Sequence, residues 1–530
     1  MRALSVRMPL IYNERRRAAR RAARERSAIA TRVLFIGVDA LDRDTVLAWA
    51  EDGTLPTFRR LLREGAWGTT ENPVGLYVGA IWPSFWTSVG PDRHARYCYE
   101  QLRPGSYDTF RVRSSDVRAP AFWDTMSAAG KRVAVIDVPK THIGSGLNGI
   151  HVVDWGTHDP DFPGPLTWPQ PLAADIVARY GRDEVGTCNA HGRAGEYEKL
   201  RAQLLARVET RKRMLLDVLA REDWDAFFAV FSESHCVGHQ CWHLHDATHV
   251  RHDPAQAARI GDPMRDVYIS IDAAIGEVIA AAGPGADVFV LGSHGMRAHY
   301  DATFMLDAIL RRIERPHRTA SSAKTASRAK QVWRRTPRGL RALLAPLKGP
   351  ARERLGIRDA ATRRYFAIPN EDAYGGVRIN LMGREPAGRV KPAEFNGVCA
   401  ALEADLHALV NLDTGEPLVE RVLHIRELYS GPYLDHLPDL VVEWNRSAPI
   451  SRVHSEKTGE IRGEYTKCRT GDHSPHGFFT VTGPAAAKGP LKGMVSVMDF
   501  GPTIAERLGV TLTGVDGRSF AERAFIGARG

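Results

Sequence analysis

The feature that most constrains the fold is a repeated alternation between short apolar runs and longer amphipathic segments. The run VLFIGVD at residues 33–39 is almost continuously apolar and ends in an acid, which is typical of a buried parallel strand. Similar runs follow amphipathic stretches at residues 132–138, 225–233 and 287–295. Because parallel strands need a crossover connection, this order predicts an α/β fold, with a doubly wound, mostly parallel sheet and helices on both faces.

Positive charge is concentrated in two segments of the 530-residue chain. Residues 1–32 carry a balance of +8 and residues 311–364 a balance of +14, so the rest of this +10 chain carries about −12. We therefore expect a basic N-terminal extension at residues 1–32, one α/β domain at residues 33–530, and a basic surface insertion within it at about 315–364.

The two basic segments would suit an anionic membrane surface or another polyanion, and their neutral interpretation is a solvated tail and a surface loop. The sequence contains no specific nucleic-acid motif. It also has no apolar run near the roughly 18–20 residues of a membrane-spanning helix, and no secretory apolar stretch after the first arginines. Its six cysteines show no zinc-like pairing and fit a reducing compartment, so we expect a cytoplasmic location.

Residues of metal-ligand type follow several of the predicted strands. Asp39 ends the first strand, and histidine-rich stretches lie at residues 233–246, 293–299 and 471–477. In an open α/β sheet, the carboxyl ends of the strands meet at the edge where ligands bind. The sequence therefore predicts a binding site that draws on segments far apart in the chain.

Three histidines within these stretches form a candidate zinc site. His235 and His239 are spaced i, i+4, which places both imidazoles on one face of a helix. His473, between two glycine-containing turns of a distant segment, is the candidate for the third ligand. We call His235, His239 and His473 the three-histidine site; three imidazoles suffice to hold Zn²⁺ with a fourth position open.

Five segments carry motifs that match one enzyme family: GVDA at 37–40, AIWPSFWTSVGPDRH at 80–94, SESHCVGHQCW at 232–242, LGSHGM at 291–296 and GDHSPHGFFTVTGP at 471–484. Together they resemble the type I phosphodiesterase and nucleotide pyrophosphatase branch of the alkaline phosphatase superfamily, over roughly residues 33–520. The resemblance implies that residues 33–530 form an alkaline phosphatase-like catalytic domain that hydrolyses phosphate esters.

The family binds two metal ions, commonly zinc, on either side of a Thr, Ser or Cys nucleophile. The resemblance places the three-histidine site in one metal position, with His235 where the family has Asp; Zn²⁺ is the expected ion and Mn²⁺ an alternative. The second position keeps only Asp39 and His294, because Ser293 stands where the family has a carboxylate.

The family nucleophile is not retained. Depending on the alignment, its position falls on Val78 or Ile81, and neither side chain can attack phosphorus. Ser84 and Thr87 are the nearby hydroxyls and the candidate catalytic residues, although Thr87 matches a structural Thr of the family. Asp472 would either replace the lost carboxylate or orient a ligand imidazole.

Three functional hypotheses remain at this point. The first is a metal-dependent hydrolase of a small phosphorylated substrate, such as a phosphodiester or nucleotide, in which activated water attacks directly and inverts configuration at phosphorus. The second is a catalytically inactive descendant that binds a phosphorylated or sulfated ligand. The third is a basic adaptor held on anionic membranes or nucleic acid, with binding that falls steeply as salt rises.

Overall fold

The structure is a computed structural model that describes residues 32–144, 146–185, 194–315, 359–371 and 373–527. The expected N-terminal extension at 1–32, apart from Arg32, and the expected insertion at 315–364, apart from its two ends, lie outside these residues. Both therefore stay predictions.

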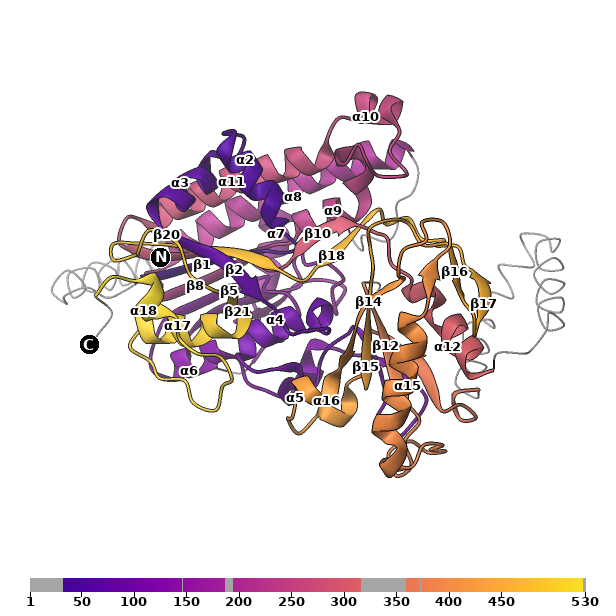
Figure 1. The fold of residues 1–530 in the computed structure, drawn as a ribbon. Helices are drawn as coiled ribbons and strands as arrows, with labels where there is room; N and C mark the ends of the chain where they lie inside the picture. Colours follow the sequence, from indigo (N-terminus) through magenta and orange to yellow (C-terminus); the bar gives the residue numbers. More distant parts are fainter. Residues whose placement is uncertain (1–31, 145, 186–193, 316–358, 372, 528–530) are drawn as a thin grey trace, which may run out of the picture.

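A ten-stranded sheet forms the centre of the molecule (Figure 1). Its spatial order is β20 (Gly489–Pro490), β2 (Ala66–Glu71), β19 (Gly477–Thr482), β9 (Ala286–Gly292), β1 (Arg32–Val38), β8 (Ala226–Phe231), β5 (Val133–Ile136), β6 (Gly149–Val153) and β7 (Leu166–Trp168), with β21 (Val495–Ser496) also paired to β2. The strands from β9 to β6 are parallel, whereas β19 and β7 run antiparallel to their neighbours. This confirms the predicted mostly parallel sheet.

Helices cover both faces of this sheet (Figure 1). One face carries α2 (Arg43–Glu51), α3 (Pro56–Glu64), α7 (Leu172–Tyr180), α8 (Ala194–Arg221) and α11 (Pro263–Ala282), and the other carries α4 (Tyr77–Thr87), α6 (Phe122–Ala128), α17 (Phe500–Arg507) and α18 (Ala521–Ala524). Doubly wound topology of this kind buries the central strands on both sides, which explains their continuous apolar character.

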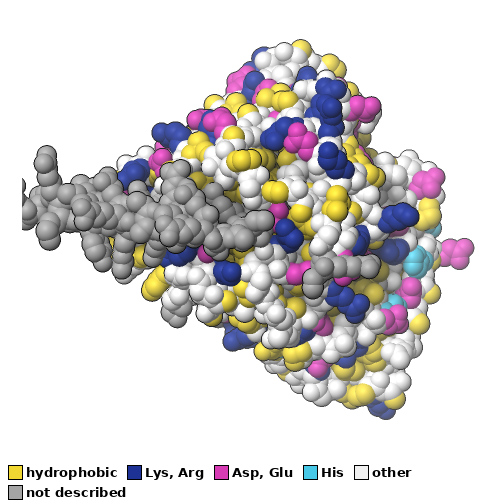
Figure 2. All heavy atoms as spheres, turned by 90° about the vertical axis from the view of Figure 1, so that its left-hand side faces the viewer, with side chains coloured by type: hydrophobic (Ala, Val, Ile, Leu, Met, Phe, Trp, Pro, Cys, Tyr) yellow, Lys and Arg dark blue, Asp and Glu magenta, His cyan; other side chains and the backbone are white. Residues whose placement is uncertain are grey.

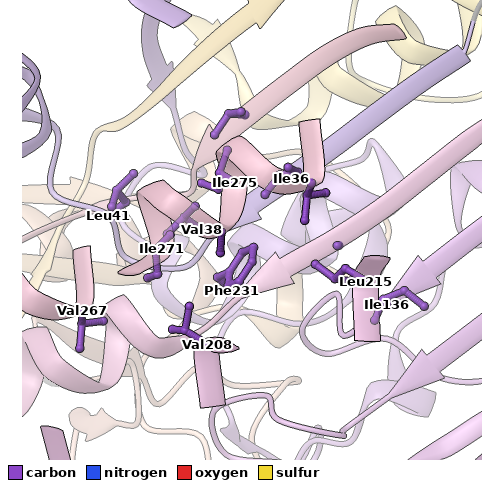
Figure 3. Packing of buried hydrophobic residues seen from close by; sticks show 14 of the residues in the cluster. Ile36, Val38, Leu41, Ile136, Val208, Leu215, Phe231, Val267, Ile271 and Ile275 are labelled. Carbon is purple, nitrogen blue, oxygen red and sulfur yellow. The ribbon is translucent and has the colours of Figure 1, made fainter. Parts of the chain in front are cut away.

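Alternate residues of β1 show this burial on both sides. Ile36 and Val38 pack in the core under α8 and α11, where Figure 3 shows them near Ile271 and Ile275. Phe35 points to the opposite core and stacks on Phe85 of α4, with ring centroids 4.5 Å apart. The period of two along a strand therefore divides one apolar run between two cores.

A second, smaller lobe was not predicted from the sequence (Figure 1). Its antiparallel sheet has the order β11 (Tyr365–Ile368), β12 (Tyr374–Ile379), β15 (Leu440–Trp444) and β14 (Val419–His424). The helices α12 (Leu306–Glu314) and α15 (Phe395–His407) share its core, and a further sheet joins β13 (Val410–Asn411), β16 (Arg452–Ser455) and β17 (Gly459–Arg462). Residues 365–444 thus contribute an antiparallel sheet of their own and no strand of the central sheet.

Short elements complete the part of the chain that the structure describes. Two-stranded sheets join β3 (Glu100–Leu102) to β4 (Thr109–Arg111) and β10 (Gly295–Ala298) to β18 (Gly471–Ser474). Four short or mid-length helices are α5 (Pro91–His94), α9 (Glu233–His245), α10 (Pro254–Ile260) and α16 (Ile425–Leu428). The pairing of β10 with β18 sets Met296 opposite His473, and so joins two of the predicted site segments.

The surface of the described body carries charges of both signs. On the face in Figure 2, Lys and Arg side chains are interspersed with Asp and Glu and do not gather into one patch. None of the described helices combines the length and the apolar character needed to cross a bilayer. The five cysteines in the described ranges form no disulfide with one another.

Candidate functional site

The structure brings the three-histidine site together. His235 and His239 lie on consecutive turns of α9, and β18 carries His473 to the same place. One ligand atom from each residue lies within 4.8 Å of the others, and the Nε2 atoms of His235 and His473 are 3.1 Å apart. Two nitrogen ligands of a tetrahedral zinc ion lie about 3.3 Å apart, so the spacing suits such an ion.

All three imidazoles are buried and held in the neutral form. Burial lowers the pKa of each ring well below its usual range, and neighbouring imidazoles lower it further; Arg469 adds to the effect at His239 and His473. The Nδ1 of His239 lies 2.8 Å from the carbonyl oxygen of Gly471 and donates to it, which leaves Nε2 as the lone-pair nitrogen. Among the described residues this Nε2 has no hydrogen-bond partner. A buried, neutral imidazole with a fixed tautomer is the form that binds a metal ion.

Asp472 lies behind the three-histidine site and not on the substrate side. Its Oδ1 accepts a hydrogen bond from the backbone nitrogen of His473 at 2.8 Å and lies 3.9 Å from Nδ1 of His239. Its Oδ2 lies 3.5 Å from Nε2 of His299. Burial alone raises the pKa of Asp472, but His299, His239 and nearby arginines lower it to about 2. Of its two predicted roles, this position fits the orientation of ligand imidazoles.

The second predicted metal position is reduced to a hydrogen-bonded chain. The Oδ1 of Asp39 accepts from the indole nitrogen of Trp82 at 2.8 Å and from Oγ of Ser293 at 3.1 Å. That same Oγ lies 2.9 Å from Nδ1 of His294. Within the described residues, no group of three His, Cys, Asp or Glu ligands includes Asp39 or His294. Ser293 therefore ties these two residues to each other where a carboxylate ligand is missing.

A cavity of about 320 Å³ opens beside these residues, and Asp39, His235, His294 and His473 contribute to its wall. This volume suits a small ligand. The wall also holds five cationic side chains, namely Arg96, Arg111, Lys140, Lys467 and Arg469, but only three carboxylates, namely Asp39, Asp159 and Glu371. The excess of positive charge favours an anionic ligand.

The wall of the cavity holds Val78 at one of the two aligned nucleophile positions. Val78 lines it from the first turn of α4, whereas Ile81 is buried in the core beneath the sheet. Cys98 also lines the cavity, but its Sγ donates to Oε1 of Glu371 at 3.2 Å. Burial and the charge of Glu371 raise the pKa of this thiol well above its usual range, so it stays protonated and weakly nucleophilic.

Ser84 and Thr87 do not reach the cavity. The Oγ of Ser84 is fully buried and lies 2.9 Å from Nε2 of His94, and the hydroxyl of Thr87 donates to the carbonyl oxygen of Pro83 at 2.6 Å. The later turns of α4 carry both side chains into the protein interior. This geometry lends no support to their predicted catalytic role, because neither hydroxyl lies on the wall of the cavity.

Three groups near the site were not predicted from the sequence. The ring of His158 stacks 4.1 Å from the ring of His235, and Arg96 and Lys140 line the cavity. Lys140 follows β5, so the rule that polar residues after strands form the site would have found it. His158 follows β6, a strand whose apolar run is short. Arg96 carries no local signal, because it lies in a loop after α5.

Comparison with known proteins places these observations in a family. A model described as type I phosphodiesterase/nucleotide pyrophosphatase matches residues 33–475. Human ectonucleotide pyrophosphatase/phosphodiesterase 5 is similar in structure at 12% identity, covering 92% of this chain and 97% of its own, with a TM-score of 0.49. Phosphonoacetate hydrolase from Sinorhizobium meliloti 1021, in complex with phosphonoacetate, is similar at 14% identity, covering 91% and 96%, with a TM-score of 0.48.

No curated protein matches the chain. The family assignment rests on the family model, which spans most of the sequence and includes every segment of the three-histidine site. The chain therefore belongs to the type I phosphodiesterase/nucleotide pyrophosphatase family of the alkaline phosphatase superfamily.

Proposed function

We propose that this protein is a metal-dependent hydrolase of phosphate esters that holds one Zn²⁺ at the three-histidine site, with Mn²⁺ as the alternative ion. The observation that carries the proposal is the convergence of His235, His239 and His473 beside a cationic cavity, whose wall includes His235 and His473. Membership of the phosphodiesterase family supports the reaction class, and favours a phosphodiester or nucleotide-like substrate. When bound, such an ion supplies Lewis acidity toward a phosphoryl group.

The other residues of the site have roles that follow from their positions. The cationic wall attracts and orients an anionic phosphate ester. Asp472 fixes the backbone at His473 and places its negative charge 3.9 Å from Nδ1 of His239. Val78 offers no atom that forms a covalent bond to phosphorus. Hydrolysis here would therefore use direct attack by water, and it would invert configuration at phosphorus.

The alternative is a non-catalytic member of the family that binds a phosphorylated or sulfated ligand. The apolar side chain of Val78 at the aligned nucleophile position favours it, as does the closed chain from Asp39 through Ser293 to His294. The hydrolase and the non-catalytic binding protein would share the cavity and one metal ion. Only the hydrolase would turn over a phosphate ester, so a measurement of hydrolysis distinguishes the two.

Metal content and hydrolysis measured together test the proposal. We expect about one zinc ion per wild-type chain by elemental analysis, and zinc-dependent hydrolysis of bis(4-nitrophenyl) phosphate. His239→Ala removes one of three ligands, so metal and turnover should fall together to background. His245→Gln is the matched control, because His245 lies on the same helix but binds Asp262 at 2.7 Å outside the cavity.

Each outcome separates the two readings. Zinc binding without turnover in the wild type would favour the ligand-binding alternative. A wild-type protein that neither retains zinc nor hydrolyses the ester after zinc addition would contradict the proposed hydrolase. Equal losses in His239→Ala and His245→Gln would point to damage of α9 and not to a lost ligand.

A further inference from the structure

We propose that Arg96 binds a second anionic group of the ligand, so that the substrate carries a carboxylate or an additional phosphoryl group besides the phosphoryl group held near the three-histidine site. This inference rests on the proposed function for the position of the first phosphoryl group. It narrows the substrate class from phosphate esters in general to those with a second anion.

Arg96 is a buried cation for which the described residues supply no ion-pair partner. Its side chain lines the cavity, yet only 1% of its surface is exposed to solvent. Among the residues that the structure describes, neither Nε nor Nη1 has a hydrogen-bond partner, and no carboxylate lies within ion-pair distance of the guanidinium. A buried charge without compensation is costly to folding. A ligand anion in the cavity would supply the missing partner.

The nearest carboxylates are committed to other donors. Asp159, Asp161 and Glu371 all act on Arg96 through their charge, but none forms an ion pair with it. Their partners are the guanidinium of Arg111 at 3.2 Å for Asp159, the backbone nitrogen of Ser114 at 2.7 Å for Asp161, and Sγ of Cys98 at 3.2 Å for Glu371. The protein thus surrounds Arg96 with distant negative charge but leaves its donors free toward the cavity.

Comparison with Arg211 shows what a structural buried arginine looks like in this molecule. Arg211 has no exposed surface, and its guanidinium donates to Asp137 at 2.7 Å and to the carbonyl oxygen of Gly156 at 2.7 Å. These contacts connect α8 to the end of β5. Arg96 has the same burial and none of these bonds, so a purely structural role does not account for it.

The cavity wall adds a second cation near Arg96, the partly buried Lys140. Its Nζ donates to the carbonyl oxygen of Asp159 at 2.7 Å and lies 3.7 Å from Oδ2 of the same residue. An arginine fork binds both oxygens of a carboxylate or phosphoryl group, and a lysine adds a point charge. Two cations apart from the metal ligands exceed what one phosphodiester, with its single charge, would use.

Calorimetric binding of matched phosphonates to the full chain, with and without added Zn²⁺, tests the inference. Ethylphosphonate carries only the phosphoryl group, phosphonoacetate adds a carboxylate, and methylenebisphosphonate adds a second phosphoryl group. Longer carboxyalkylphosphonates place the carboxylate farther from the phosphoryl group, and each is compared with its alkyl counterpart. We expect at least one doubly anionic probe to bind tenfold or more tightly than its alkyl counterpart, since a charged hydrogen bond contributes about that much.

Arg96→Met should abolish this difference, so that each doubly anionic probe binds about as tightly as its alkyl counterpart. Arg96→Lys should retain part of the affinity difference between a doubly anionic probe and its alkyl counterpart. Arg111→Met is the matched control, because Arg111 lines the same cavity but already pairs with Asp159. Arg96→Met should also keep or raise the Tm, because it removes an uncompensated buried charge, whereas loss of a structural arginine would lower it.

The outcomes separate this inference from the proposed function. Ethylphosphonate binding with no gain from any second anion overturns the inference and leaves the hydrolase proposal standing. Absence of binding by every probe overturns both. A gain that survives in Arg96→Met but disappears in Arg111→Met assigns the second anion to Arg111 and overturns the role of Arg96.

Discussion

At the scale of single residues, two side chains decide what chemistry the site retains. Ser293 has a hydroxyl where the family resemblance places a carboxylate, and this hydroxyl bridges Asp39 and His294. Val78 has two methyl groups where the resemblance places a nucleophile. The hydrogen bonds of Ser293 and the apolar side chain of Val78 are what the structure shows at these two positions, and the proposed water-dependent hydrolysis rests on them.

A hydroxyl placed at residue 78 should change the stereochemical course of hydrolysis at phosphorus. Val78→Thr keeps the size of the side chain but puts an Oγ1 on the cavity wall. If hydrolysis then proceeds through a covalent intermediate, two inversions at phosphorus give net retention. The measurement is the configuration of the product from a chiral phosphorothioate diester, which we expect to be inverted for wild type and retained for the variant. Val89→Thr, buried away from the cavity, is the control and should leave inversion unchanged.

His245 provides a test of stability against pH. Burial alone lowers its pKa, but the hydrogen bond and charge of Asp262 raise it above the unfolded value of about 6.5. The native state therefore favours the protonated ring, and this contribution is complete below pH 6.5 and lost as pH rises through the native pKa. His245→Gln should lower the unfolding free energy by about 0.5–1 kcal/mol more at pH 5.5 than at pH 8.5, measured by urea denaturation.

At the scale of elements, the site depends on how closely β18 approaches α9. A Cβ at Gly471 would lie 2.3 Å from the carbonyl oxygen of Gly238 in α9. The backbone nitrogen of Thr470 also donates to the carbonyl oxygen of His239 at 2.8 Å. Because this contact joins two segments more than two hundred residues apart, a glycine at residue 471 is what lets His473 reach the pair on α9.

Gly471→Ala should push β18 away from α9. We expect a loss of about 1–3 kcal/mol of stability from the backbone overlap, and zinc occupancy that falls even at temperatures where the protein stays folded. Elemental analysis beside thermal unfolding measures both. Gly397→Ala is the control, because a Cβ there meets nothing within 4 Å on α15, and it should keep zinc and gain up to about 1 kcal/mol. Full zinc occupancy in Gly471→Ala would contradict this account.

At the scale of the whole molecule, two lobes build one cavity. The main sheet supplies Asp39 and His294 at its strand ends, and the loop between β11 and β12 of the smaller lobe supplies Asn370 and Glu371. Separate apolar cores stabilise the two lobes. The three-histidine site belongs to the larger lobe and its β10–β18 ribbon, whereas part of the cavity wall belongs to the smaller lobe.

Hydrogen exchange should reveal this division. Strand β1 pairs with β8 on one side and β9 on the other and is buried on both faces, so its amides should open only with global unfolding. The edge strand β17, paired only with β16 and partly exposed, should exchange by local opening at least about a hundredfold faster. Mass-resolved exchange under native conditions makes the comparison. Equal protection of β1 and β17 would show one cooperative unit instead.

The sequence by itself determined the parts of this protein that depend on near neighbours. The apolar run before Asp39 indicated a strand buried on both faces, and the i, i+4 spacing of His235 and His239 indicated two imidazoles on one helix face. These predictions held because a strand or helix repeats with a period of a few residues, and that period is visible in the chain. The motifs along residues 33–475 were equally local and led to the family.

Only the tertiary structure decided which side chains meet. It buried Ser84 and Thr87, separated Asp472 from the cavity and built an antiparallel lobe that periodicity did not indicate. It also buried Arg96 where, within the described ranges, Nε and Nη1 have no hydrogen-bond partner. Each of these outcomes depends on how segments far apart in the sequence cross and pack. A local pattern reports which face of an element is apolar, but it carries no information about what will lie against that face.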